Sequence, residues 1–378
     1  MVVALLFLGC APAPRPSEMG EPVPAPGLRG AAESITIVAS GDVLIHQGGV
    51  LVRQAAAAGR QKGTGYDFDP VYAQIAPLVR DADLAICHLE TPLAPAHGPF
   101  TGYPTFSVQP QIVDALRAAG YDTCSTASNH TLDAGFAGLT RTLDILDAKQ
   151  LRHTGSFRTE ADSRRPLLLD IRGVKVAQIS WTYGLNGIPK PEGKEWAVNV
   201  FDAGPPDLSG LLTDAARARR AGAQIVIASV HCCTEYTHDP GPAQLDIARG
   251  LLGSPDVDLV LGHHAHVVQP FERINGKWVI YGLGNQVAEQ GRGPTEDSLL
   301  ARFTLTRGPD GRYTTTKAEA IPTWIQLSGG PATIVNTAVG RDDTTTPQRS
   351  AHAASYQRVV DVLNRRGALR QGLTITGS

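Results

Sequence analysis

One stretch, residues 258–268, constrains this chain more than any other: an apolar run stops at a glycine and continues directly into three histidines. An apolar run of this length, bounded by a turn residue, is typical of a buried strand. Gly262 is expected to let the backbone turn sharply where that strand ends. The histidines would then lie in a loop at the carboxyl end of the strand, where open α/β sheets bind their ligands. The stretch reads Asp258-Leu259-Val260-Leu261-Gly262-His263-His264-Ala265-His266-Val267-Val268.

The spacing of these histidines predicts a metal site. Neutral imidazole is a good ligand for Zn, Fe, Mn and Ni. In an extended segment alternate side chains share a side, so His264 and His266 are expected to point together and His263 to point away. A lone histidine is more often a satisfied core residue, but a cluster directly after a strand and a glycine favours metal binding. The remaining ligands must come from elsewhere in the chain.

Strand-like and helix-like patterns alternate along the chain, which predicts an α/β domain over residues 34–327. One of the expected helices covers residues 70–81. Residues 328–378 are expected to form a C-terminal extension, in which a polar loop over 329–349 precedes a short helix over 356–366. The expected strands include 34–40, 84–87, 121–126, 166–171, 174–180, 224–230, 258–261, 299–305 and 314–326.

Side chains of the kinds that bind metals follow four other predicted strands. Any one of them alone is more often a helix cap or a turn residue, but their recurrence at one strand end after another favours a shared site. Asp133, three residues after His130, would either orient the ring of His130 or cap the following helix. The candidates are Asp42 with His46, Glu90, Asn129 with His130, and His231.

Carboxylate, amide and imidazole groups together predict a site with mixed oxygen and nitrogen ligands. Two divalent ions fit such a set, because a carboxylate placed between them bridges both and the pair activates a water as nucleophile. Since thiolates are scarce in the set, Mn, Fe or Zn in a working site is favoured over a structural zinc.

Charge and composition argue against some functions. A formal net charge of −2 and an aromatic content of 6% do not favour a nucleic-acid partner.

The cysteines have no CxxC spacing, so they do not predict a structural zinc site. Cys87 and Cys124 fit either a disulfide or buried free thiols equally well. For the adjacent Cys232 and Cys233, packing is favoured over redox sensitivity.

The N-terminus is predicted to be a targeting segment. Residues 1–10 contain an apolar run that leads to Gly9-Cys10 and resembles a bacterial lipoprotein signal, with cleavage before Cys10 and lipid attached to it. An ordinary secretory signal is the alternative. Residues 11–33 are rich in proline and predict a semi-extended tether. The expected location is therefore outside the cytoplasm, anchored to the cell membrane through Cys10.

Several motifs follow one another along the chain: Gly41-Asp42, Leu89-Glu90-Thr91-Pro92-Leu93, Ser128-Asn129-His130-x-x-Asp133-x-Gly135, His231-x-x-x-Glu235-Tyr236, Gly262-His263-His264-x-His266-Val267 and Tyr281-x-Leu283-Gly284-Asn285. In this order they resemble the bacterial capsule-synthesis protein CapA family, over roughly residues 35–288. Members are linked to poly-γ-glutamate capsules, and their domain is similar to calcineurin-like metallophosphoesterases. The resemblance implies a four-layer αββα sandwich, with two sheets face to face and helices outside.

The resemblance also implies a role for each matching residue. His130 would assist the leaving group, with Asp133 beside it. His46 lies four residues after Asp42, whereas metallophosphatases typically have Asp-x-His, so His46 departs from the pattern although it is still a candidate ligand. The other ligands would be Asp42 and His266 for the first ion, Asn129, His231 and His264 for the second, and Glu90 between the two.

The expected function is that of a surface-anchored, metal-dependent hydrolase of phosphoester or amide bonds in capsule or poly-γ-glutamate metabolism. The alternative is a non-catalytic accessory protein for assembly or export of an anionic cell-envelope polymer. Expected partners are an anionic polymer or phosphoester substrate and a membrane complex that synthesises the polymer. Cys232-Cys233, Ala265 and Gln286 depart from the usual family residues, which bears on the shape of the substrate pocket rather than on the ligands.

Overall fold

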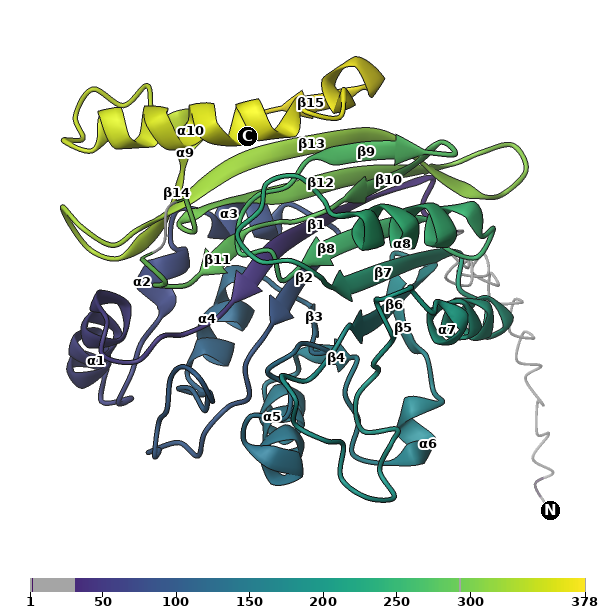
Figure 1. The fold of residues 1–378 in the computed structure, drawn as a ribbon, viewed down its shortest axis with the longest axis horizontal. Coiled ribbons are helices and arrows are strands. Elements are labelled where there is room, and N and C mark those ends of the chain that lie inside the picture. Colours follow the sequence, from purple (N-terminus) through teal and green to yellow (C-terminus); the bar gives the residue numbers. More distant parts are fainter. Residues whose placement is uncertain (1, 3–30, 292–293, 378) are drawn as a thin grey trace. The chain divides into compact units, whose positions relative to one another are not determined.

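The computed structural model describes Val2, residues 31–291 and residues 294–377, and the chain from Ala31 onward forms one compact unit. Within these residues the strands form two sheets (Figure 1). The expected signal segment and tether lie outside the described residues, apart from Val2 and the last three tether residues. No helix among the described residues has the length and apolarity needed to cross a bilayer.

The first sheet is built around β1 (Ser34–Val43). Its strand order is β14-β13-β12-β1-β2-β3-β4, with β11 beside β1 and β15 beside β13. Strands β1 to β4 run parallel, and β12 lies antiparallel to β1 on its other side. The remaining strands are β2 (Leu84–Leu89), β3 (Thr123–Ser125), β4 (Arg152–Thr154), β11 (Asn285–Val287), β12 (Asp297–Arg307), β13 (Tyr313–Gln326), β14 (Thr333–Asn336) and β15 (Leu373–Ile375).

The second sheet has the strand order β5-β6-β7-β8-β10-β9. Its middle strands, β6, β7, β8 and β10, run parallel, and hairpins place β5 and β9 antiparallel at the two edges. The strands are β5 (Leu167–Ile171), β6 (Val174–Thr182), β7 (Ile225–His231), β8 (Leu259–His263), β9 (Phe271–Ile274) and β10 (Lys277–Ile280).

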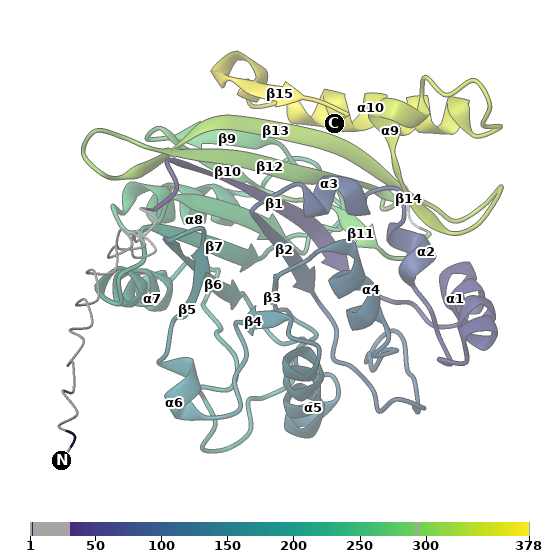
Figure 2. The ribbon, with the colours of Figure 1, turned by 180° about the vertical axis from the view of Figure 1, so that it is seen from behind.

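Helices cover the outer face of each sheet (Figures 1 and 2). On the first sheet these are α1 (Val50–Lys62), α2 (Asp69–Tyr72), α3 (Ala76–Arg80), α4 (Ile112–Ala119) and α5 (Gly135–Ala148). On the second sheet they are α7 (Ser209–Arg220) and α8 (Pro242–Gly253). Other short helices are α6 (Glu160–Ser163), α9 (Thr337–Gly340) and the 3-10 helix η1 (Ala368–Gln371).

Alternation along β1 divides its side chains between two cores. Ile35, Ile37 and Ala39 pack between the sheets, in the same cluster as residues of β7 and β8. Val38, which points to the opposite face, packs with the helices of the outer layer. The layers are therefore helices, sheet, sheet and helices, and the expected four-layer αββα sandwich is confirmed.

Some elements differ from the sequence expectation. The helix expected over 70–81 is two short helices, α2 and α3. Pro77 lies in the first turn of α3, and its nitrogen cannot donate to the preceding turn. Residues 329–349, expected as loop, contain β14 and α9. The C-terminal helix α10 (Arg349–Leu363) begins before the expected position.

The cysteines outside the N-terminal segment are paired as disulfides. Cys87 and Cys124 lie opposite each other on β2 and β3, and their Cα atoms are 4.4 Å apart. Of the two alternatives expected for this pair, a disulfide or buried free thiols, the structure contains the disulfide. Cys232 is bonded to its neighbour Cys233, directly after β7, and both side chains pack in the apolar cluster around α7 and α8, as expected.

The C-terminal residues complete the core of the sandwich. Strand β15 pairs with β13, and Val359, Val362 and Leu363 of α10 belong to the apolar cluster between the sheets. A buried carboxylate also anchors α10: Asp297 accepts hydrogen bonds from Oγ of Ser355 (2.6 Å) and from Nε and Nη2 of Arg358 (2.7 and 2.8 Å).

Arg358→Met should destabilise the protein by about 1–3 kcal/mol, because among the described residues it leaves the buried carboxylate of Asp297 with Ser355 as its single side-chain donor, while it keeps the apolar stem of the side chain. Arg365→Met is the matched control. Its partner Asp239 is exposed, so the loss should be about 0.5 kcal/mol or less. Urea denaturation of both variants measures the difference, and equal losses would contradict the anchoring role of Asp297.

Candidate metal centre

The candidate residues of both sheets meet at one end of the sandwich. Strands β1 to β3 are parallel, as are β7 and β8, and the arrows of β1, β2 and β7 point toward the same side of the molecule (Figure 1). The residues that follow parallel strands are brought to a single edge in this way. Three groups of side chains there lie close enough to hold an ion: Asp42, Glu90 and His266; Glu235, His264 and His266; and Asp42, His88 and His263.

Asp42 joins the two sheets. Its Oδ1 accepts a hydrogen bond from Nδ1 of His263 (3.0 Å), and its Oδ2 accepts one from the backbone N–H of His264 (3.2 Å). Burial alone would raise the pKa of Asp42, but the hydrogen bond and charge of His263 outweigh burial and lower that pKa to about 2. A Cβ on Gly41 would lie 1.9 Å from the carbonyl oxygen of Gly284, so glycine is required directly before Asp42.

Glu90 is a buried carboxylate whose oxygens lack hydrogen-bond donors. Neither Oε1 nor Oε2 has a partner among the described residues, although the residue is only 1% exposed. Its Oε1 lies 4.0 Å from Nε2 of His231 and 3.7 Å from Nε2 of His266. Burial, followed by the charge of Asp42, raises the pKa of Glu90 well above its ordinary value. An unpaired buried carboxylate is costly, and divalent ions beside it would satisfy both oxygens, so these residues fit a metal.

A second group of candidate ligand atoms lies around His231, whose Nε2 is 4.0 Å from Oε1 of Glu90. Oδ1 of Asn129 lies 2.8 Å from Nε2 of His231, which in turn lies 3.1 Å from Nδ1 of His264. The amide nitrogen of Asn129 donates to Oδ1 of Asn186 (3.1 Å), which turns the Asn129 oxygen toward the histidines. An amide oxygen and two imidazole nitrogens that converge in this way form a ligand set for a transition metal.

The orientation of His266 is held by its neighbours. The amide nitrogen of Asn285 donates to Oε1 of Gln290 and to the carbonyl of Thr295, each at 2.9 Å. The amide oxygen of Asn285 therefore accepts a hydrogen bond from Nδ1–H of His266 (2.9 Å). Nε2 of His266 then keeps its lone pair, on the side of Glu90. Histidines that bind metals typically have the other ring nitrogen held by such a hydrogen bond.

His130 and Asp133 form a hydrogen-bonded pair beside this cluster. Nδ1 of His130 lies 2.7 Å from Oδ2 of Asp133, which also accepts from the backbone N–H of Phe106. The N-cap of α5 is Ala134, which has no side-chain cap, so Asp133 orients the His130 ring instead of capping the helix.

The structure does not bring His46 into any of the three groups. Its Nδ1 accepts a hydrogen bond from the backbone N–H of Glu289 (3.3 Å), and its ring packs edge-on against Phe106. Burial lowers the pKa of His46 to about 4, so the ring is neutral. The four-residue spacing from Asp42 carries His46 beyond the end of β1 and onto the wall of the adjoining cleft.

The histidine stretch after β8 adopts a different backbone from the expected one. Strand β8 continues through Gly262 to His263, so the strand does not end at the glycine. A Cβ on Gly262 would lie 2.0 Å from the carbonyl oxygen of Tyr281, which explains the glycine as a close approach. His264 and His266 have φ values of 85° and 55°, so they are not extended, yet both reach the cluster.

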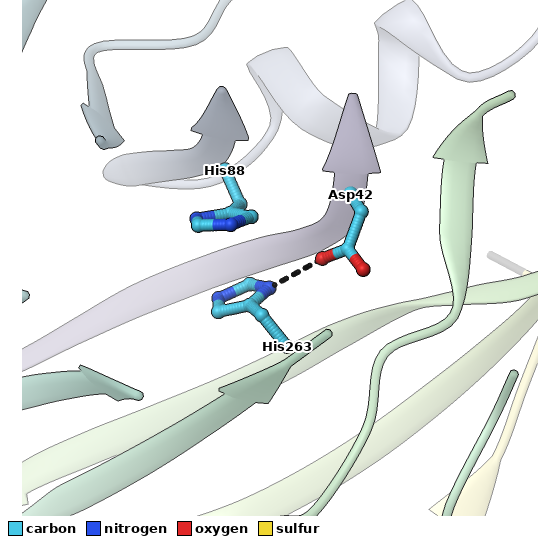
Figure 3. A group of neighbouring side chains, drawn as sticks. All are labelled: Asp42, His88 and His263. Carbon is cyan, nitrogen blue, oxygen red and sulfur yellow. Dashed lines mark hydrogen bonds and ion pairs between the residues drawn. The ribbon is translucent and has the colours of Figure 1, made fainter. Parts of the chain in front are cut away.

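His263 was expected to point away and instead contacts Asp42, and His88 was missed altogether (Figure 3). His88 lies inside β2, where the sequence reads as an ordinary buried strand. The two rings stack with their centroids 4.1 Å apart and 18° between planes, so their in-plane lone pairs do not converge on one ion. Burial is the largest cause that lowers the pKa of both His88 and His231, so these two rings are neutral.

A cleft of about 530 Å³ opens onto the cluster. Glu235 lies on its wall, within reach of His264 and His266, and was not singled out from the sequence although it belongs to the fourth motif. The lining residues are Leu44, His46, Tyr103, Pro104, Thr105, Phe106, Asn129, His130, Asp133, Asn186, Ile188, Glu235, Tyr236, His266 and Gln290.

Known proteins are similar in sequence to part of this chain. The "PGA biosynthesis protein CapA" of Bacillus subtilis is 26% identical over 264 residues, 68% of this chain and 65% of the relative. A "probable polyglutamine synthesis accessory protein" of Mycobacterium tuberculosis is 27% identical over 218 residues, 54% of this chain and 55% of the relative. The chain therefore matches less than two thirds of the length of these relatives.

Among solved structures, the calcineurin-like phosphoesterase YfkN of Bacillus subtilis has a TM-score of 0.45 and 13% identity, covering 87% of this chain and 98% of that one. Such a low score does not by itself establish a common fold, so family membership depends on the sequence. The family model described as "Bacterial capsule synthesis protein PGA_cap" matches residues 36–290, which contain all the candidate ligands. The chain belongs to this family of bacterial capsule synthesis proteins.

Proposed function

We propose that this protein is a dinuclear metal-dependent hydrolase of phosphoester or amide bonds in capsule or poly-γ-glutamate metabolism. The observation that carries the proposal is the carboxylate of Glu90, buried between His231 and His266 with no donor among the described residues. The ions would be Mn, Fe or Zn, given the oxygen and nitrogen ligands.

The ligands divide between two ions, with Glu90 common to both. The first ion would be held by Asp42 and His266, which form one group with Glu90, and Nε2 of His266 lies 3.7 Å from Oε1 of Glu90. The other ion would be held by Asn129, His231 and His264. Nε2 of His231 lies 2.8 Å from Oδ1 of Asn129 and 3.1 Å from Nδ1 of His264. His46 is left out of this set, because it belongs to none of the groups that could hold an ion.

A bound pair of divalent ions would supply a lowered pKa for water and a Lewis acid for the developing charge. The chain would supply the proton for the leaving group through His130. Asp133 holds Nδ1 of that ring, so Nε2 is the nitrogen that delivers the proton, and the carboxylate stabilises the protonated ring. His130 lines the cleft, where a substrate would enter.

We propose an anionic polymer or a phosphoester as substrate, and a membrane complex that makes the polymer as a partner. The names of the Bacillus subtilis and Mycobacterium tuberculosis relatives refer to synthesis. The second of these names describes an accessory protein, which favours one alternative: a metal-binding accessory protein for assembly or export without turnover of its own. We further propose export and anchoring to the membrane as a lipoprotein.

Glu90→Gln tests the metal centre through stability. In metal-free protein the pKa of Glu90 is raised above 4.5, so the folded state binds more protons than the unfolded state and stability falls as pH rises through this window. The metal-free variant should therefore melt higher than wild type at about pH 7, and the two should converge toward about pH 4.

Mn²⁺ at 100 times its Kd should stabilise wild type by about 2.7 kcal/mol and leave the variant nearly unchanged. Equal stabilisation of both by Mn²⁺ would remove Glu90 from the ligands.

His130→Ala and His266→Ala separate catalysis from metal binding. His130→Ala should keep its metal while turnover of an activated phosphodiester falls by about 10²–10⁴, the usual contribution of a general acid. A better leaving group should partly rescue it, since less protonation is needed. His266→Ala should lose metal and activity together, with no rescue. Turnover and bound metal are measured on the same samples.

The acid role of His130 fails if both variants lose metal equally. If wild-type protein holds metal but turns over no phosphoester or amide, the accessory function takes the place of the hydrolase.

Cys10→Ala tests the anchor. The cysteine lies outside the described residues, so this prediction depends on the sequence alone. The variant should move from the membrane fraction to the soluble fraction, since a lost lipid removes the anchor. Fractionation with immunodetection measures it, and a variant that stays with the membrane contradicts the lipoprotein signal.

A further inference from the structure

We propose that His88 is a positioning residue that sets the tautomer of His231 and so presents the metal-binding nitrogen of that ring. The inference rests on the proposed metal centre. His88 lies at the middle of a buried hydrogen-bond chain: its Nε2 is 2.9 Å from Nδ1 of His231, and its Nδ1 is 2.8 Å from Oγ of Ser125. All three residues are at most 1% exposed.

Two neutral rings can share a proton between these facing nitrogens in two ways. In the first, Nδ1–H of His231 donates to Nε2 of His88, and Nδ1–H of His88 donates to Ser125. In the second, every proton is reversed: Nε2–H of His88 donates to Nδ1 of His231, and the hydroxyl of Ser125 donates to Nδ1 of His88. In the second arrangement Nε2–H of His231 also donates to Oδ1 of Asn129, 2.8 Å away. In the first, Nε2 and that oxygen are both acceptors, and a cation bound between them would satisfy both.

Only the first arrangement leaves His231 able to bind metal. Nε2 of His231 is the atom that faces Asn129, His264 and Glu90, and it must carry a lone pair to be a ligand. The second arrangement places a proton on that nitrogen and blocks it. The hydroxyl of Ser125 can follow the first arrangement, because the carbonyl oxygen of Cys87 lies 3.4 Å from Oγ and accepts its proton.

No bulk water can take the place of His88. The ring packs between those of His231 and His263, with centroid distances of 4.9 and 4.1 Å, inside the layer where the two sheets meet. The acceptor for Nδ1–H of His231 must therefore come from the protein. His88 would accept the Nδ1 proton of His231 just as the amide oxygen of Asn285 accepts the Nδ1 proton of His266.

The test compares zinc affinity in full-length variants, by competition with a chromophoric chelator. His88→Leu removes the acceptor and should weaken Zn²⁺ binding by about 10- to 100-fold. His88→Gln offers an amide oxygen in its place and should keep most of the affinity. Thr123→Val is the matched control: it removes a buried hydrogen bond to Gln178 (2.8 Å) from the strand that carries Ser125, and zinc affinity should remain that of wild type.

A second measurement uses the wild-type protein and does not depend on how the variants fold. In the zinc-loaded state, ¹⁵N chemical shifts should place the protons of both His231 and His88 on Nδ1. A proton on Nε2 of His88 would overturn the inference, as would equal zinc affinity in wild type and His88→Leu, or an equal loss in the Leu and Gln variants. Wild-type protein that binds no zinc, manganese or iron would instead refute the metal centre itself.

Discussion

The candidate site depends on one contact between the sheets, the carboxylate of Asp42 against the end of β8. Asp42 lies at the end of the central strand of the first sheet, and it accepts hydrogen bonds from His263 and from the backbone of His264 in the second. Glu90 directly follows β2 of the first sheet, and it faces His231 at the end of β7 and His266 in the loop after β8. The site therefore exists only where the sheets pack face to face, and the close backbone contacts at Gly41 and Gly262 bring the strand ends together.

Much of this arrangement could be predicted from the sequence, because the informative signals are local. Apolar runs followed by Asp42, Glu90 or His231 indicate strand ends, and parallel strands bring such ends to one edge. The αββα layers came from family resemblance, since periodicity alone does not say how many sheets the strands form. The spacing of Asp133 is compatible with two roles, orienting His130 or capping α5. The structure distinguishes them, because the N-cap position of α5 is Ala134.

The errors arose where tertiary contacts override local pattern. An extended segment would turn His263 away from His264, but the left-handed backbone at His264 breaks the alternation, and His263 is still within the strand. His88 could not be found by motif, because a histidine inside a buried strand reads as core until the histidine of the facing sheet is seen 2.9 Å away. His46 shows the converse, a suitable residue type whose spacing carries it past the cluster.

The segment that matches the family model, residues 36–290, is shorter than the compact unit that begins at Ala31 and includes β15. The family match ends at residue 290, whereas β12 begins at Asp297 and pairs with β1 from Ser34 to Ser40, along the strand that leads to Asp42. A protein cut at the family boundary would leave that side of β1 as an open edge and uncover the apolar residues that β12 and α10 bury. Such a fragment would retain every candidate ligand and still be prone to pair with other chains through β1, so the recombinant boundary belongs after β15.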